Sequence, residues 1–136
     1  MALPAPRILL IMPEQWPRAL LRAALREAGY DAAGAPGIPG ALHYRATDPD
    51  RGPVRLVVID QDALRGAEAG SELAALAARH GRPELMLLAR GAAPLPPVAR
   101  DFEWHHTVRR PASIAELVEA VRVALPLPAE GRRPLD

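Results

Sequence analysis

Three short apolar segments constrain the fold of this chain more than any other feature of its sequence. They span residues 7–12, 54–59 and 84–89, and each is followed directly by a proline or a charged residue. Segments of this length that are almost wholly apolar, rather than alternating with polar residues, are typical of strands buried on both faces of a parallel sheet. We therefore expect a central parallel sheet with helices packed against both faces.

Helical patterns lie between and after these segments. From Pro17 onward, aliphatic side chains recur at helical spacing, and Gly29 follows as a C-terminal cap. The alanine- and leucine-rich range 68–80 is a second predicted helix. A third begins at Ser113, which forms a capping-box pattern with Glu116, and ends before a Pro-Leu-Pro sequence. The buried face predicted for the first helix consists of Leu20, Leu21, Ala24, Leu25 and Ala28.

The remaining segments have weaker patterns. Residues 30–35 and 104–109 are predicted as two further strands. Proline and glycine interrupt regular structure over 35–40, residues 41–46 are poorly patterned, and 91–97 is too rich in proline for a regular helix. Five strands then alternate with helices, which implies right-handed crossovers and places functional side chains at the carboxyl ends of the strands.

Length and composition exclude several classes of protein. With 136 residues, 49% of them hydrophobic, we expect one domain over 1–136, with its core in 7–125 and a flexible tail over 126–136. The 17 basic and 16 acidic residues leave a net charge of +1, which gives no electrostatic argument for nucleic acid or an anionic membrane. Cysteine is absent, which excludes disulfides and thiol nucleophiles. Without a signal-peptide pattern or a long apolar run, we expect a cytoplasmic protein.

Two motifs at predicted strand ends resemble those of bacterial response regulator receiver domains. Residues 57–60, Val-Val-Ile-Asp, are similar to the receiver strand that ends in the phosphoacceptor aspartate, and residues 108–113 are similar to the lysine-proline segment before the last helix. The resemblance implies a flavodoxin-like three-layer sandwich, with a five-stranded parallel sheet of order 2-1-3-4-5 and helices on both faces. It places Asp60 at the phosphoacceptor position and Arg110 at the lysine position.

The sequence departs from the receiver pattern where a metal ion would bind. Receivers carry an acidic pair just past the first strand, which together with the acceptor aspartate holds the Mg²⁺ that neutralises the transferring phosphoryl group. Met12 and Pro13 occupy those positions here. Glu14 lies one position further on, where the chain would have to turn back to bring it to Asp60. We expect no cofactor, and Mg²⁺ only if Asp60 is phosphorylated after all.

The receiver switch is also incomplete. The hydroxyl residue that follows the fourth receiver strand corresponds to Ala89, and the switch aromatic corresponds to Thr107. Arg110 keeps the charge of the lysine but not its geometry. We therefore predict a degenerate pseudo-receiver that is not an enzyme, is not phosphorylated and acts by protein–protein interaction. The alternatives are a working receiver phosphorylated at Asp60 and, more weakly, a small-molecule sensor or enzyme that uses a cleft near Asp60, Arg110 and His106.

The charged residues near these motifs also have simpler structural interpretations. An ion pair between Asp60 and Arg110 is expected in place of the metal, because guanidinium and carboxylate groups pair readily. Asp62 is interpreted as a helix N-cap or a solvated loop acid rather than as a second metal ligand. His105 and His106 are adjacent on a predicted strand, so their side chains point to opposite faces and cannot chelate one ion together.

A basic stripe on the first helix is the candidate surface for a partner. Arg18, Arg22 and Arg26 recur every fourth residue. The simpler interpretation is a solvated face in an arginine-rich chain, and the alternative is a docking site for a protein partner such as a histidine kinase, a phosphotransfer domain or another regulator. Trp16 and Trp104 are expected to cover the rim of the core. Homodimerisation through the last strand and helix is a further expectation from the resemblance.

Overall fold

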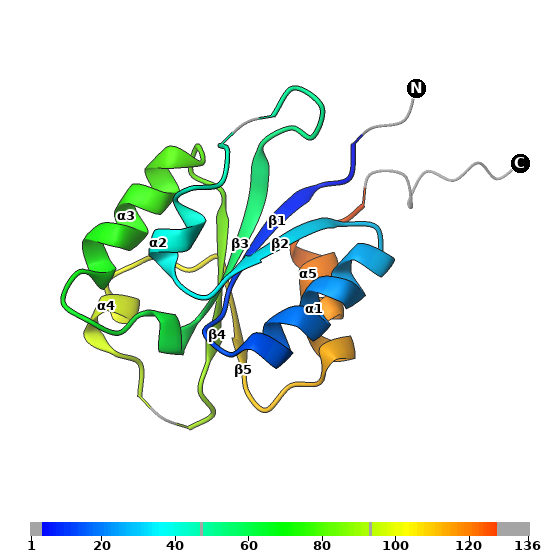
Figure 1. The fold of residues 1–136 in the computed structure, drawn as a ribbon. Helices are drawn as coiled ribbons and strands as arrows, with labels where there is room; N and C mark the ends of the chain where they lie inside the picture. The colour runs from blue at the N-terminus through cyan, green and yellow to red at the C-terminus, as the bar shows by residue number, and fades with distance from the viewer. Residues whose placement is uncertain (1–3, 47, 93, 128–136) are drawn as a thin grey trace, which may run out of the picture.

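Five parallel strands form one sheet in the computed structural model, which describes residues 4–46, 48–92 and 94–127 (Figure 1). The strand order is β2-β1-β3-β4-β5, and every adjacent pair is parallel. This order confirms the fold class inferred from the alternating pattern and the resemblance. The strands are β1 (Arg7–Ile11), β2 (Asp31–Ala35), β3 (Val54–Asp60), β4 (Glu84–Ala89) and β5 (His106–Arg109).

Helices cover both faces of the sheet, which makes three layers. Helices α1 and α5 pack on one face, and α2, α3 and α4 pack on the other (Figure 1). Both α2 and α4 have only four residues, and α5 begins with the predicted capping box of Ser113 and Glu116. No helix in the described part of the chain is long and apolar enough to cross a membrane. The helices are α1 (Gln15–Glu27), α2 (Ile38–Ala41), α3 (Ala69–Arg79), α4 (Pro97–Arg100) and α5 (Ile114–Ala124), with a 3₁₀ turn η1 (Gln61–Ala63) after β3.

Two hydrophobic clusters lie on either side of the central strands. Successive strand residues point to opposite faces, so Ile8 and Leu10 of β1 pack toward α1 and α5, whereas Leu9 and Ile11 pack toward α2 and α3. All four side chains are buried. Burial on both faces explains why the central strands are apolar at successive positions rather than at alternate ones.

The first helix differs from the sequence prediction in its extent and in its buried face. It begins at Gln15 rather than near Pro17, which places Trp16 in its first turn. Successive helical residues are about 100° apart, so a face centred on Leu21 and Leu25 turns Trp16 and Leu20 away from the sheet. Trp16 is 72% exposed and Leu20 is 55% exposed. The predictions that Trp16 covers the core and that Leu20 is buried are therefore wrong.

Three smaller differences have local causes. Residues 38–41 form a helical turn within a stretch predicted as irregular, because the fixed φ of Pro39 suits the first turn of a helix. The last strand starts at His106 rather than at residue 104, while Trp104 packs against the core and donates its Nε1–H to the Ala99 carbonyl at 2.7 Å. Leu127, assigned to the tail by sequence, packs against the cluster on the α1 and α5 side. Residues 128–136 of the predicted tail lie outside the described residues.

Candidate functional site

Asp60 lies at the carboxyl end of β3, where the alternating fold places functional side chains. It is only 4% exposed, although it is a carboxylate. Its Oδ1 accepts a hydrogen bond of 2.8 Å from the backbone N–H of Asp62, so Asp60 itself caps the 3₁₀ turn η1. Its Oδ2 accepts a hydrogen bond from Nη2 of Arg110. The predicted ion pair is therefore present, and both carboxylate oxygens have partners.

Arg110 reaches Asp60 from the segment that follows β5. Its backbone N–H donates to the Ala89 carbonyl at 2.9 Å, which holds this segment against the end of β4. Gly91 allows that close approach, because a Cβ there would lie 3.2 Å from the Arg110 carbonyl oxygen. The Nε of Arg110 is buried and has no hydrogen-bond partner among the described residues. The peptide bond between Arg110 and Pro111 is cis.

A second ion pair lies beside the first and was not predicted. Nε and Nη2 of Arg90 contact the two carboxylate oxygens of Asp62 at 3.0 and 3.1 Å, and Arg65 approaches the same carboxylate at 3.4 Å. Gln61 accepts a 2.9 Å hydrogen bond from the Arg90 backbone N–H. Asp62 is therefore neither an N-cap nor a freely solvated acid. The signal was available in the sequence, since Arg90 and Asp62 follow adjacent strands and must meet at the same edge of the sheet.

The residues around Asp60 do not fit a magnesium ion. Met12 is 3% exposed and belongs to the hydrophobic cluster beneath α1 and α5, and Pro13 has no donor atom to offer in its side chain. Glu14 is exposed just before α1. Within residues 4–46, 48–92 and 94–127, no group of three His, Asp or Glu side chains is placed to hold a metal ion. Since Mg²⁺ prefers several oxygen ligands, Asp60 with its arginine partner is a poor site for it.

The two positions matched to the receiver switch offer no coupled pair of side chains. Ala89, the last residue of β4, is fully buried and has no hydroxyl. Thr107 of β5 is exposed. The last residue of β4 therefore offers no hydroxyl donor. That the receiver switch is lost at Ala89 and Thr107 stays a prediction.

The arginines of α1 do not form the uniform solvated stripe that was predicted. Arg18 donates to the Met12 carbonyl at 2.6 Å, and its aliphatic stem lies so close to Gly34 that a Cβ there would be 3.0 Å away. Arg22 donates from Nε to the Ala32 carbonyl on the edge strand β2 at 3.3 Å. Arg26 is exposed. The Arg18 guanidinium is thus bound to a backbone carbonyl of the same chain. The Arg22 side chain makes one such hydrogen bond but is still exposed.

The two adjacent histidines bind separate partners, and only His106 belongs to the strand on which both were predicted to lie. Nδ1 of His105 accepts from the Leu85 backbone N–H at 3.0 Å, and Nε2 of His106 lies 2.8 Å from the Glu84 carboxylate. Both partners lie at the start of β4. His106 is therefore at the opposite end of β5 from Arg110 and is not part of a cleft with Asp60, which corrects that element of the small-molecule hypothesis.

Hollows occur near the carboxyl end of the sheet and at its opposite end. The first, of about 530 Å³, is lined by Gln61, Asp62, Arg65 and Arg90, together with Leu64, Gly66 and two prolines, but not by Asp60 or Arg110. The second, of about 470 Å³, lies between the start of β3 and the turn from α3 to β4. Neither hollow opens onto the ion pair of Asp60.

Comparison with solved structures shows that this chain has the receiver-domain fold. The chemotaxis protein CheY4 of Vibrio cholerae superposes with a TM-score of 0.70 at 13% identity, covering 89% of this chain and 99% of that one. A CheY-like receiver domain protein of Methanospirillum hungatei gives a TM-score of 0.69 at 16% identity over 88% and 93%. An orphan response regulator of H. pylori gives 0.64 at 16% over 88% and 96%. No protein-family model and no curated protein matches the sequence.

Proposed function

We propose that this chain is an atypical, stand-alone receiver-like domain that acts in signalling or regulation by binding other proteins, without phosphorylation. The observation that supports this most directly is the guanidinium of Arg110 on the carboxylate of Asp60. The receiver fold is a fold of signalling modules, and we do not expect enzymatic activity. A cytoplasmic location and homodimerisation through β5 and α5 stay predictions.

Phosphorylation of Asp60 would face two chemical obstacles. Transfer of a phosphoryl group requires a free carboxylate oxygen as nucleophile and a divalent cation to neutralise the charge of the phosphate. Here Oδ2 is covered by Arg110 and Oδ1 accepts from the Asp62 backbone N–H. Met12 and Pro13 stand where the resemblance places the metal-binding acids. The arginine supplies a positive charge that stabilises the carboxylate but blocks the approach of a phosphodonor.

The two ion pairs also favour a single conformation of the segments after β3, β4 and β5. Arg110 joins the end of β3 to the segment after β5, and Arg90 joins η1 to the segment after β4. The pair of Arg90 with Asp62 has two contacts and therefore fixes orientation as well as distance, and the pair of Arg110 with Asp60 adds a single contact. A surface held in one arrangement suits a domain whose binding does not depend on a phosphorylation switch.

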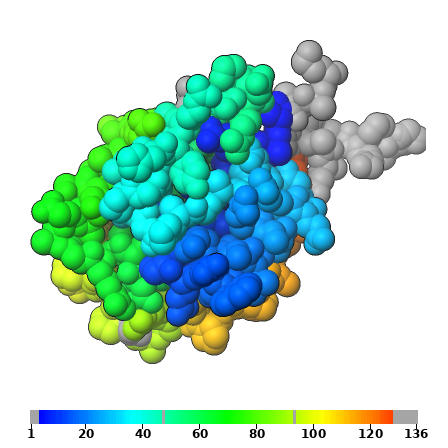
Figure 2. All heavy atoms as spheres, viewed as in Figure 1, coloured from blue at the N-terminus to red at the C-terminus, as the bar shows by residue number. Residues whose placement is uncertain are grey.

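The outer face of α1 is the surface we propose for the partner. Trp16 and Leu20 are exposed one helical turn apart on one flank of this face, and Arg22 and Arg26 are exposed one turn apart on its other flank. In Figure 2 this helix lies on the face toward the viewer, with its outer side uncovered. Large apolar side chains flanked by cations suit an amphipathic helix with acidic flanks, as a histidine kinase, a phosphotransfer domain or another regulator could present.

Incubation with acetyl phosphate and Mg²⁺, followed by intact mass spectrometry, tests the first part of the proposal. We expect no phosphoryl adduct under conditions in which a receiver domain with its acidic pair becomes fully phosphorylated. The Asp60→Asn variant is the matched control for modification elsewhere in the chain. A stable adduct on the wild type that this variant loses would establish the alternative, a working receiver.

A further inference from the structure

Gln61 is a nearly buried side-chain amide with an unused hydrogen-bond donor. It is only 9% exposed, and it lines the hollow of about 530 Å³ at the carboxyl end of the sheet. Its Oε1 accepts from the backbone N–H of Arg90, so its Nε2 is the NH2 group. This Nε2 has no hydrogen-bond partner among the described residues and is not fully enclosed by protein atoms. Buried polar groups nearly always have partners, so a free donor at the wall of a hollow indicates a place for an acceptor of a ligand.

Two guanidinium groups lie at the same hollow. Arg90 and Arg65 both contact the carboxylate of Asp62, so the two cations are held near each other. Arg90 uses Nε and Nη2 for this contact and Arg65 uses Nη2 alone, so the Nη1 of each makes no hydrogen bond with a described residue. These three are the charged residues that line the hollow, and together they leave one positive charge without a counterion.

The remaining wall of the hollow is apolar, and it is formed by Leu64, Gly66, Pro94 and Pro96. Small-molecule sites combine apolar walls with a few polar groups, and the volume of this hollow lies in their usual range. One net positive charge matches a carboxylate better than a doubly charged phosphate. Arginine side chains also bind carboxylates readily through charge-assisted hydrogen bonds.

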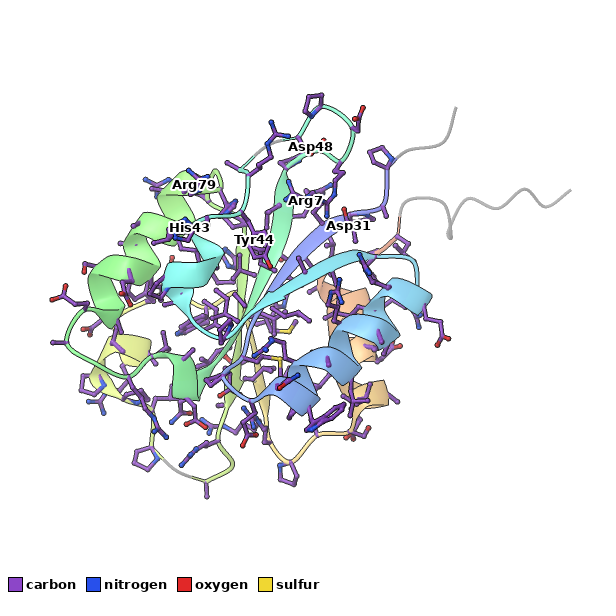
Figure 3. The ribbon with its side chains drawn as sticks, in the orientation of Figure 1. Arg7, Asp31, His43, Tyr44, Asp48 and Arg79 are labelled. Carbon is purple, nitrogen blue, oxygen red and sulfur yellow. The ribbon has the colours of Figure 1, made fainter. Side chains whose placement is uncertain are left out.

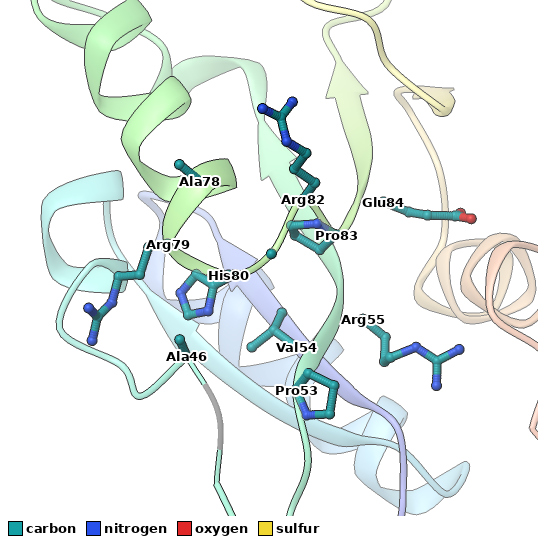
Figure 4. A pocket seen from close by; sticks show the side chains of 11 residues that line it. Ala46, Pro53, Val54, Arg55, Ala78, Arg79, His80, Arg82, Pro83 and Glu84 are labelled. Atoms are coloured by element: carbon teal, nitrogen blue, oxygen red, sulfur yellow. The ribbon is translucent and has the colours of Figure 1, made fainter.

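The hollow at the opposite end of the sheet does not have this arrangement. Arg55, Arg79 and Arg82 line it, but their side chains extend in different directions in Figure 4. The guanidinium of Arg79 is bound to the Tyr44 carbonyl, and Figure 3 shows both residues in this corner of the molecule. Because these cations do not converge, we assign no ligand to that hollow.

We propose that the hollow lined by Gln61, Arg65 and Arg90 binds a small organic carboxylate with an apolar body. The carboxylate accepts from the Gln61 amide and from the two guanidiniums, and the apolar body lies against the leucine and the prolines of the wall. Such a ligand contacts the segments after β3 and after β4 at once. The site goes beyond the proposed function, because no residue of α1 lines it and it does not depend on whether Asp60 is phosphorylated.

NMR titration with sodium benzoate tests this proposal, because benzoate carries one carboxylate on an apolar ring. Benzoate should shift the side-chain NH2 signals of Gln61 and the Nε–H signals of Arg65 and Arg90 until they saturate. Benzamide, a neutral molecule of nearly the same shape, should bind at least about tenfold more weakly, because it lacks the charge that strengthens these hydrogen bonds. Equal binding of benzoate and benzamide would overturn the proposal. Tighter binding of inorganic phosphate than of benzoate would overturn the assignment to a carboxylate.

Two variants place the benzoate in this hollow. Gln61→Glu keeps the oxygen that accepts from the Arg90 N–H but replaces the free donor with an anionic oxygen, so benzoate should bind at least about tenfold more weakly. Arg65→Gln removes an exposed cation, should have a similar effect, and supplies the test if Gln61→Glu does not fold. Arg109→Gln is the matched control, since Arg109 is exposed at the same end of the sheet but does not line the hollow. Unchanged binding in either folded variant, or an equal loss in Arg109→Gln, would overturn the proposal.

Discussion

Arg110 and Asp60 are fifty residues apart in sequence, yet the guanidinium of one lies on the carboxylate of the other. Asp60 ends β3 and Arg110 follows β5, with β4 between them. Neighbouring strands are about 4.8 Å apart, so the arginine side chain must extend across the width of one intervening strand. The long side chain of Arg110 spans this width and brings a positive charge to the carboxylate.

Arg110→Ala should destabilise the fold by about 1–3 kcal/mol, because it leaves the buried Asp60 carboxylate without its charged partner. Chemical denaturation of the variant and the wild type measures the difference, and added Mg²⁺ should not restore the loss. Arg109→Ala is the matched control, since Arg109 is exposed and its guanidinium contacts only the Gly91 carbonyl among the described residues. Equal stability of Arg110→Ala and wild type, or stabilisation of the wild type by Mg²⁺, would count against the ion pair as the substitute for a metal.

Gly91→Ala and Gly70→Ala should change stability in opposite directions. A Cβ at Gly91 would lie 3.2 Å from the Arg110 carbonyl oxygen, so the backbone must move and the contact with Asp60 should weaken. At Gly70, within α3, the nearest atom would be a Val98 methyl at 3.5 Å, an ordinary contact, and alanine favours helix by up to about 1 kcal/mol. Thermal melts of the two variants are the measurement. A stabilised Gly91→Ala protein would show that the segment after β4 can move without cost.

The ion pair of Arg51 with Asp31 should contribute to stability only above strongly acidic pH. A hydrogen bond from Arg51 is the main cause that lowers the pKa of Asp31 below its ordinary 3.8. Because the folded pKa is the lower one, the contribution is complete above the unfolded pKa and is lost as the pH falls through the folded pKa. For a partly exposed pair the contribution is about 1 kcal/mol or less. Denaturation of wild type and Asp31→Asn at several pH values should give a stability difference that shrinks as the pH falls below 3.8, the ordinary pKa of the group. A constant difference across that range would contradict this assignment.

Partner binding should depend on α1 and not on Asp60. Trp16→Ala should weaken the complex most, because an exposed tryptophan that becomes buried is a typical interface anchor. Reversal of Arg22 and Arg26 to Glu should slow association and reduce its salt dependence, since exposed charges act mainly by steering. Surface plasmon resonance with a co-purifying protein measures both effects.

Asp60→Asn is the control for this surface and should leave affinity nearly unchanged. Arg18→Glu is not an equivalent charge reversal, because Arg18 holds the Met12 carbonyl and its loss should lower stability. If Asp60→Asn abolishes binding while the α1 variants have no effect, then the strand-end site is the functional surface.

The sequence by itself determined the sheet, the order of its elements and the ion pair at its edge. Apolar runs such as 54–59 predict buried parallel strands. When helices cover both faces of a strand, none of its side chains faces water, so successive residues are apolar rather than alternating with polar ones. Asp60 at the end of one such run and Arg110 in the receiver-like segment after another strand were sufficient to predict their contact. The capping box at Ser113 and Glu116 was equally local and appears as predicted.

Only the tertiary structure decided which side chains remain free. Leu20 and Leu21 are equally apolar in sequence, but the contact between α1 and the sheet buries one and exposes the other. Arg18 and Arg26 belong to one four-residue repeat, yet Arg18 is bound by the Met12 carbonyl because the chain turns back past it. The periodicity of a sequence predicts which residues share one face of a helix. Packing between distant segments decides whether that face points to the core or to solvent, and which backbone groups it contacts.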